Sequence, residues 1–402
     1  MLAGLDTDVR LASPGPLFIA ALGVLMCFGP MAIDMYLPAL PAIGLAFKVG
    51  QDKVQWSLSA FFLGFGVGQI FWGTLADWLG RRRPVAAGIL LYGIGCIGCS
   101  LTNDIGHLAI WRFVQALGAC AGPVLARAMV RDVFGRDRAA SVLSLMMLVM
   151  GVAPMVAPMI GGHILLIGTW RTIFWVQACF VVVAFAGLVS LPETLPVGRR
   201  QPARVAGMAY AYVRLLVDRR YVGYALSSSF IYGGMFAYVS GTPFVYIELF
   251  GVRPENYGYL FGVNIVGMII VNTINSRVVM KYGTDRVLRM GCLLAAVTGL
   301  VLMGFAVTGV GGLASIATAL GIFMALTGMI AANAMAGGMS IHPEIAGSAS
   351  ALTGALQFVF GAIAGSAVGS LANGTAVPLA GVICACALAA TLVNLLLVRR
   401  AS

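Results

Sequence analysis

The chain has 402 residues, of which 60% are hydrophobic and 10% charged, and its net charge is +11. Soluble domains average about 45–50% apolar and about 25% charged residues, so this composition argues against a water-soluble enzyme. Disordered chains are poor in apolar residues and are excluded as well. The composition predicts an all-α integral membrane protein.

Apolar runs of about 20 residues, long enough to cross a bilayer, recur along the chain. We expect twelve membrane-spanning helices that begin near Pro16, Val54, Pro84, His107, Ala140, Arg171, Tyr221, Asn256, Arg286, Gly312, Ala346 and Ala376. One long, polar and basic connection separates six spans from six. We therefore predict an N-terminal six-helix bundle over residues 1–191, a linker over 192–220 and a C-terminal six-helix bundle over 221–402.

The basic residues collect on one side of this predicted topology. That side holds six linker arginines together with Arg10, Arg81–Arg83, Arg131, Arg136, Arg138, Arg277, Lys281, Arg286, Arg289, Arg399 and Arg400. The opposite side holds only Lys48, Lys53, Arg171 and Arg253. By the positive-inside rule the first side is cytoplasmic, with both termini there. The net charge therefore sets orientation and attracts anionic lipid, and it indicates no nucleic-acid partner.

One acidic residue stands apart because it lies inside a span. Asp34 is in the first span, and a charge in the hydrocarbon costs about 2.5–3.5 kcal/mol or more. Arg112 of the fourth span lies at a similar depth, with Gln115 one turn away on the same face. We expect Asp34, Arg112, Tyr36 and Gln115 to form a proton and substrate site in one central cavity. A static buried ion pair between the two helices is the alternative.

Polar and aromatic residues of other spans are candidates for lining this cavity. Binding pockets are mostly apolar with a few polar groups that orient the ligand. The candidates are Tyr232, Phe236, Tyr238, Asn272, Gln357 and Phe358.

A segment rich in glycine and arginine joins the second and third predicted spans. It contains Gly73, Asp77, Gly80 and Arg81. The glycines permit a tight turn and close helix approach, and Asp77 is placed to cap a facing helix N-terminus. We expect Arg81 to pair with Asp132 at the end of the fourth span. These contacts would form a gate that latches the cytoplasmic side shut.

Two further segments bear on the architecture. The connection between the eighth and ninth spans, residues 275–286, is a degraded copy of the Gly73–Pro84 segment, which predicts two halves related by pseudo-two-fold symmetry. The fifth span carries Pro154, Pro158, Gly161 and Gly162, which are typical of a bent helix that packs closely against its neighbours.

Taken together, these segments resemble those of the major facilitator superfamily along the whole chain. The resemblance to its motifs A, B and C is carried by Gly73–Pro84, Arg112–Gly118 and Ala157–Gly162. Within motif A the chain departs at Trp78, where arginine is usual. Motif C is the antiporter motif.

A narrower resemblance is to the Bcr/CflA subfamily of drug-resistance transporters. It is carried by Asp34–Pro41, Tyr238–Val245 and Ile345–Ala351. The resemblance implies the major facilitator fold and proton-coupled export of drugs from a bacterial inner membrane. We expect a monomer that uses the proton gradient and no cofactor or metal.

Three other functions stay open on the sequence alone. An exporter of one metabolite, such as an amino acid or peptide, would share the fold and the proton coupling. An uncoupled facilitator is disfavoured by the embedded acid Asp34. A membrane enzyme is disfavoured because the chain has three histidines and no H-x-x-x-H, G-x-S-x-G or G-x-x-x-x-G-K-[ST] pattern.

Overall fold

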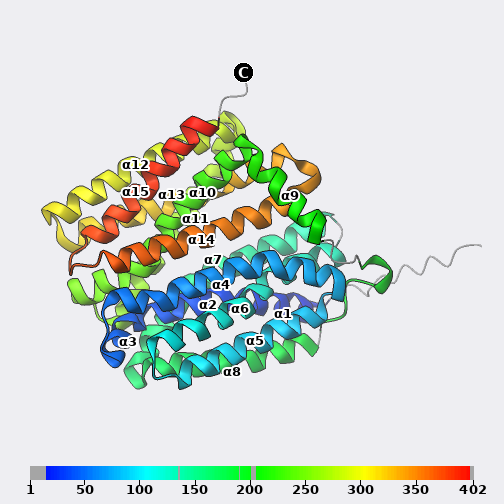
Figure 1. Cartoon of the computed structure of the whole chain (residues 1–402), viewed down its shortest axis with the longest axis horizontal. Helices are drawn as coiled ribbons and strands as arrows, with labels where there is room; N and C mark the ends of the chain where they lie inside the picture. Colours follow the sequence, from blue (N-terminus) through cyan, green and yellow to red (C-terminus); the bar gives the residue numbers. More distant parts are fainter. Residues whose placement is uncertain (1–14, 135, 190, 201–204, 399–402) are drawn as a thin grey trace, which may run out of the picture.

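The structure is a computed structural model that describes residues 15–134, 136–189, 191–200 and 205–398. Among these residues the secondary structure is helical, and the long helices run side by side along the longest axis of the molecule (Figure 1). The charged residues Arg10, Arg204, Arg399 and Arg400, to which the sequence assigns a role in orientation, lie outside the described residues.

The first bundle contains six helical passes. The first pass is divided into α1 (Pro16–Met26), α2 (Phe28–Ile33), the 3-10 segment η1 (Asp34–Ala39) and α3 (Leu40–Phe47). The other five are α4 (Gln51–Leu79), α5 (Arg82–Leu101), α6 (Ile105–Val133), α7 (Arg136–Ile167) and α8 (Trp170–Val189). The connection that follows contains a short 3-10 turn, η2 (Val197–Arg199), and the helix α9 (Val205–Val217).

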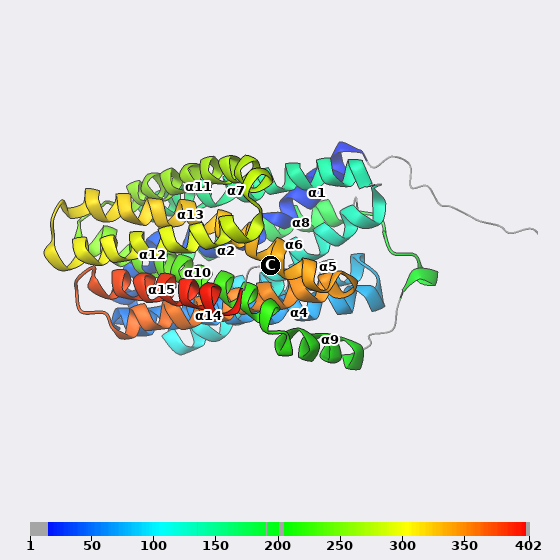
Figure 2. The ribbon, with the colours of Figure 1, turned by 90° about the horizontal axis from the view of Figure 1, so that it is seen from above.

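The second bundle also contains six long helices. They are α10 (Arg219–Pro243), α11 (Pro254–Tyr282), α12 (Thr284–Thr308), α13 (Gly312–Ile341), α14 (Ala346–Ser370) and α15 (Val377–Leu397). A π-helical segment, η3 (Phe244–Leu249), extends α10, and a 3-10 turn, η4 (Pro343–Ile345), precedes α14. Figure 2 shows the same arrangement from above. The two bundles meet along α4 with α14 and along α7 with α11.

The loops that connect the long helices lie at two ends of the molecule, the linker face and the opposite face. The linker face is the end where α1 begins and where the α4–α5 and α8–α10 connections lie, on the right in Figure 1. The opposite face carries the α3–α4 and α5–α6 connections. At the linker face Gly80 and Gly283 occupy matching connections of the two halves, with φ of 91° and 80°. Glycine adopts such positive φ values without strain, so the two halves share a turn as well as a helix order.

Eight of the twelve passes begin one to four residues earlier than the apolar runs that predict them. The largest difference is at α7, which begins at Arg136 rather than near Ala140. Polar caps explain two of the others, because the Asp104 and Asp218 carboxylates accept backbone N–H groups at the starts of α6 and α10. A cap satisfies N–H groups that have no partner within the helix, so the helix begins at the cap and not at the first apolar residue.

Hydropathy identifies eleven of the twelve passes as membrane spans among the described residues, and α10 is the exception. Its 25 residues extend about 37 Å at 1.5 Å per residue, enough to cross a hydrocarbon core of about 30 Å. Its serines Ser227, Ser228 and Ser229 are buried inside the protein. Because α10 is enclosed by other helices, it does not need the apolar surface that lipid-facing helices require.

Candidate functional site

The first pass is broken at the position of its acid. Pro30 and Pro38 lack an N–H, so neither can bond to the carbonyl four residues earlier. Those carbonyls belong to Met26, the last residue of α1, and Asp34, the first residue of η1. The prolines therefore account for the two changes in helix geometry. They place Asp34 where an α-helix changes to a 3-10 helix.

The Asp34 side chain is buried and has no hydrogen bond or ion pair to another described residue. The residue is 7% exposed. Its carboxyl group is close enough to Tyr238 of α10 and Tyr257 of α11 to interact with them electrostatically. Both tyrosines belong to the second bundle, and η1 also contacts α10 and α11. Asp34 thus lies at the boundary between the bundles.

Arg112 lies elsewhere, in the core of the first bundle. It is fully buried, and its Nη1 donates to the Ala32 carbonyl at 2.9 Å and to Gln115 Oε1 at 2.6 Å. The guanidinium carbon lies 4.3 Å from the centre of the Tyr36 ring and 4.4 Å from that of Phe61. No ion pair joins it to Asp34. The alternative of a static ion pair between Asp34 and Arg112 is therefore wrong, the two side chains have different neighbours, and the expectation that they face one cavity stays a prediction.

Helix geometry gives the reason. Side chains two residues apart project about 200° apart around an α-helix and about 240° apart around a 3-10 helix, so in neither case do they share a face. Arg112 contacts the first pass at Ala32 and Tyr36, and Asp34 lies between these two in sequence. The acid consequently projects from the other side of the pass. The depth of Asp34 and of Arg112 along their helices can be counted from the sequence. The direction in which each side chain points relative to the other helix cannot.

A chain of polar side chains extends from Arg112 through the first bundle. Gln115 Nε2 donates to Gln177 Oε1 at 2.7 Å, and Gln177 Nε2 donates to the Met31 carbonyl at 2.8 Å. The amide of Gln115 also lies 3.1 Å from Cys96 Sγ. These bonds connect α2, α5, α6 and α8. Gln177 was not among the predicted residues, although an amide in the otherwise apolar run from Ile173 to Val189 was a visible signal.

The aromatic candidates lie where the bundles meet. The Phe236 ring centre is 4.2 Å from that of Phe62, and the Phe358 ring centre is 4.5 Å from that of Phe65. Tyr232 packs beside Phe236, with ring centres 6.0 Å apart. These rings from α4, α10 and α14 form an aromatic cluster between the bundles. Phe62 and Phe65 of α4 were missed because phenylalanines are common throughout the spans.

The polar candidates have partners within the second bundle. Asn264 Nδ2 donates to the Tyr238 hydroxyl at 2.6 Å, and Gln357 Nε2 donates to Ser228 Oγ at 2.7 Å. Asn272 lies against Gly328 of α13.

Two cavities, of about 270 and 470 Å³, are found elsewhere in the described part of the chain, and neither includes a predicted cavity residue. The first lies at the opposite-face end of the second bundle, where Gln51 and Glu248 are among its lining residues. The second lies between α5 and α6, near Trp111.

The glycines of motif C lie where α7 meets two other elements. A Cβ on Gly161 would overlap the Met35 carbonyl oxygen, and one on Gly162 would overlap the Pro254 carbonyl oxygen of α11. Gly161 therefore allows α7 to approach the broken first pass beside Asp34, and Gly162 allows it to approach the second bundle. Pro154 and Pro158 lie inside α7, which is assigned as one helix from Arg136 to Ile167.

Among the described residues, three hydrogen bonds join the long helices of the two bundles, and all lie toward the opposite face. Gln55 Nε2 donates to the Ser240 carbonyl at 2.6 Å. Ser59 Oγ donates to the Ala362 carbonyl at 3.2 Å and accepts from Ser366 Oγ at 2.9 Å. We call these five residues the polar seam. It ties the first half of α4 to α10 and α14.

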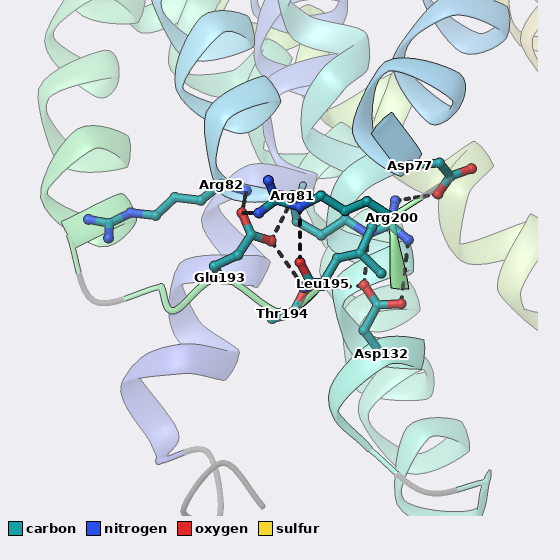
Figure 3. A network of polar contacts seen from close by, with 8 residues as sticks. All are labelled: Asp77, Arg81, Arg82, Asp132, Glu193, Thr194, Leu195 and Arg200. Atoms are coloured by element: carbon teal, nitrogen blue, oxygen red, sulfur yellow. Dashed lines mark hydrogen bonds and ion pairs between the residues drawn. The ribbon is translucent and has the colours of Figure 1, made fainter. Parts of the chain in front are cut away.

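An ionic network occupies the linker face (Figure 3). Arg81 Nε donates to Asp132 Oδ2 at 2.7 Å, and Arg81 Nη1 donates to Asp77 Oδ1 at 2.6 Å. The expected Arg81–Asp132 pair is thus present. Burial lowers the pKa of Arg81, but the hydrogen bonds to the two carboxylates outweigh burial and leave that pKa raised. Asp77 pairs with Arg81, so the expectation that it caps a facing helix is wrong.

The linker completes this network. Glu193 Oε1 accepts the Arg81 backbone N–H at 2.7 Å, and Thr194 Oγ1 donates to Asp132 Oδ2 at 3.2 Å. A Cβ on Gly80 would collide with the Glu193 carboxylate and with Arg200. No described residue of the second bundle takes part. The network therefore fastens the linker to the first bundle, and in this structure it does not form a latch between the two bundles. Gly73, the other glycine of the motif, has open space beside it, so no close helix approach requires a glycine there.

Comparison with known proteins agrees with this architecture. The Major Facilitator Superfamily profile matches residues 22–368. The chain belongs to the Major Facilitator Superfamily. It is therefore a multi-pass membrane transporter, and its family handles small-molecule substrates.

Similar proteins narrow the resemblance. The chain is 39% identical to an uncharacterized MFS-type transporter, YdgK, of Bacillus subtilis, over 90% of each chain. It is 34% identical to a bicyclomycin resistance protein homolog of Haemophilus influenzae, over 96% of each chain, which supports membership of the Bcr/CflA subfamily. The inward open structure of the xylose transporter XylE from E. coli superposes with a TM-score of 0.71 at 14% identity, covering 95% of this chain and 96% of that one, and shows the same fold.

Proposed function

We propose that the protein is a proton-coupled secondary transporter that exports drugs or other small amphipathic compounds by alternating access. The observation that carries the proposal is Asp34, a buried acid at the boundary between the bundles that has no hydrogen-bonding partner among the described residues. Intramembrane acids are functional by default because an unpaired charge there is costly. The bicyclomycin resistance homolog supports a drug-like substrate.

We place the protein in a bacterial inner membrane as a monomer, with the linker face and both termini in the cytoplasm. The described basic residues near the linker face outnumber those near the opposite face, which are Lys48, Lys53, Arg171 and Arg253. Cytoplasmic ends of spanning helices carry this excess of lysine and arginine. In that orientation the polar seam closes the outer side.

In the proposed cycle the two bundles rock about the site near Asp34. With Asp34 deprotonated, substrate enters from the cytoplasm and binds near the aromatic cluster. Protonation of Asp34 from the outside then displaces the substrate. Each charge that moves across about 100 mV supplies about 2.3 kcal/mol, which supports a concentration ratio of roughly fifty-fold.

The test is to replace Asp34 with Asn and to measure proton release by the purified protein when substrate is added. We expect release to be lost, together with resistance in a pump-deficient bacterial host. Asp52→Asn is the matched control, because Asp52 is an exposed acid in the first turn of α4. Release that persists in Asp34→Asn would remove Asp34 from this role.

The alternatives give different results in the same experiments. An exporter of an amino acid or peptide would release protons with that compound and confer no drug resistance. An uncoupled facilitator would transport substrate at a rate independent of a pH gradient in proteoliposomes.

A further inference from the structure

The linker helix α9 is apolar on two opposite sides. One side packs on the second bundle, where Leu215 is fully buried and Ala211 nearly so. Leu215 belongs to a small hydrophobic core with Tyr221, Ala225, Ala349 and Leu352 of α10 and α14. This core holds α9 against the linker-face end of the bundle.

The other side of α9 is left uncovered by the part of the chain that the structure describes. Tyr210, Val213, Leu216 and Val217 are each more than half exposed, between 52% and 79%. At 100° per residue they fall on one surface of the helix, roughly opposite Ala211 and Leu215. A helix that is apolar all round is normally enclosed by protein or by lipid. The exposed surface therefore requires an apolar neighbour.

An ionic cluster adds to the contacts that hold α9 in this orientation. Arg214 Nη2 lies 2.9 Å from Glu344 Oε1, and His342 Nε2 lies 3.0 Å from Asp218 Oδ2. Asp218 also accepts the backbone N–H groups of Arg220 and Tyr221. The cluster fixes α9 to the connection between α13 and α14. The orientation of its uncovered side is fixed with it.

The position of α9 matches the surface of a bilayer. It ends at Val217, and the membrane-crossing helix α10 begins two residues later at Arg219. In Figures 1 and 2 α9 lies level with the linker-face ends of α4 and α7 and not beyond them, and in Figure 2 it lies at the margin of the molecule. Arg219 is exposed and pairs with no carboxylate among the described residues. A guanidinium in that place complements a lipid phosphate.

We propose that α9 is an interfacial helix whose Tyr210, Val213, Leu216 and Val217 side chains enter the phospholipid layer at the boundary of headgroups and acyl chains, with Arg219 at the phosphates. Interfacial helices bury their apolar side about 5–10 Å into this boundary. The proposal is independent of what the protein transports, because it concerns the surface of the linker and not the Asp34 site.

The test uses nitroxide labels on the full-length protein in phospholipid nanodiscs. Cys179 is the exposed one of the eight cysteines, so Cys179→Ser provides the background for Val213→Cys and Leu216→Cys. Val183→Cys on the lipid-facing side of α8 and Gly198→Cys on the exposed linker turn supply the lipid and water references. Each label's collision rates with oxygen and with a water-soluble nickel chelate are measured.

We expect the ratio of oxygen to nickel collisions at positions 213 and 216 to match position 183 and to exceed position 198 clearly. A ratio equal to that of position 198 would overturn the proposal, because the surface would then face water. Low collision rates with both reagents would also overturn it, since a second protein copy would then cover the helix.

Discussion

At the scale of single residues, the two acids that bind Arg81 differ in their surroundings. The Asp132 side chain is 18% exposed and also accepts from Thr194, whereas the Asp77 side chain is 59% exposed. Partly buried charge pairs with extra hydrogen bonds stabilise more than solvent-exposed pairs, which contribute about 0–1 kcal/mol. Asp132 therefore contributes more than Asp77 to the stability of the folded protein, although the two carboxylates carry the same charge.

Replacing each acid with the isosteric amide tests this difference. We expect Asp132→Asn to destabilise the protein by about 2 kcal/mol or more, because hydrogen bonds to charged partners contribute about 1.5–3 kcal/mol. Asp77→Asn should cost under about 1 kcal/mol. The measurement is the thermal unfolding midpoint of the purified protein in detergent. Equal decreases in the two variants would contradict the assignment.

Some residues of the candidate site could be predicted from the sequence, and others could not. Asp34 could be selected because it is an acid inside an apolar run, and the structure finds it buried. Its neighbours Tyr238 and Tyr257 lie on a different bundle, and sequence spacing carries no information about contacts over such a separation. Glu193 was missed for a similar reason, because it lies in the linker and reaches Arg81 only in the folded protein.

At the scale of elements, periodicity and composition predict helices better than they predict helix ends. The starts at Pro16, Gly312 and Ala346 coincide with the predicted ones, because a proline or a glycine stands at or directly beside each of these boundaries. The breaks in the first pass follow from Pro30 and Pro38, whose effect on the carbonyl four residues earlier is local. The linker helix α9 was not expected, since a polar, basic stretch masked its apolar residues.

The docking of α9 should depend on pH through Asp218. Burial raises the pKa of Asp218, but the N–H groups of Tyr221 and Arg220, together with His342, outweigh burial and lower it. A carboxyl whose pKa is depressed on folding stabilises the protein above its unfolded pKa, about 3.9, and this contribution is lost as the pH falls through the folded value. Arg214 and Glu344 complete the charges around this group.

We therefore expect wild type to be more stable than Asp218→Asn at neutral pH, with the gap narrowing below about pH 4. Asparagine caps helices about as well as aspartate, so the variant isolates the charge from the cap at α10. Thermal unfolding midpoints across this pH range provide the measurement. A gap that stays constant down to low pH would show that the Asp218 charge contributes nothing to the docking.

At the scale of the whole molecule, the bundles are joined differently at their two ends. Toward the opposite face, the polar seam connects α4 to α10 and α14 directly. At the linker face, the network of Arg81 stays within the first bundle and the linker, and the cluster of Arg214 and His342 holds α9 to the second. Opening the opposite face thus requires breaking the seam, whereas the ionic networks can persist.

Removing the seam should therefore shift the balance between conformations. Gln55→Ala combined with Ser59→Ala removes all three hydrogen bonds of the seam. Each net hydrogen bond contributes about 1 kcal/mol, so the state with the opposite face closed loses about 3 kcal/mol. That corresponds to a roughly 150-fold change in the ratio of closed to open molecules. Ser57→Ala is the matched control, because Ser57 bonds to Tyr36 and Val54 inside the first bundle.

The measurement is the distance distribution between spin labels at Leu45 and Val310, which are exposed near the opposite-face ends of the first and second bundles. We expect the double variant to populate a longer distance than wild type and the Ser57→Ala protein to match wild type. If the double variant keeps the wild-type distribution, the seam does not hold the opposite face closed. If Ser57→Ala shifts it equally, the effect comes from loosening α4 within its own bundle and not from separating the two bundles.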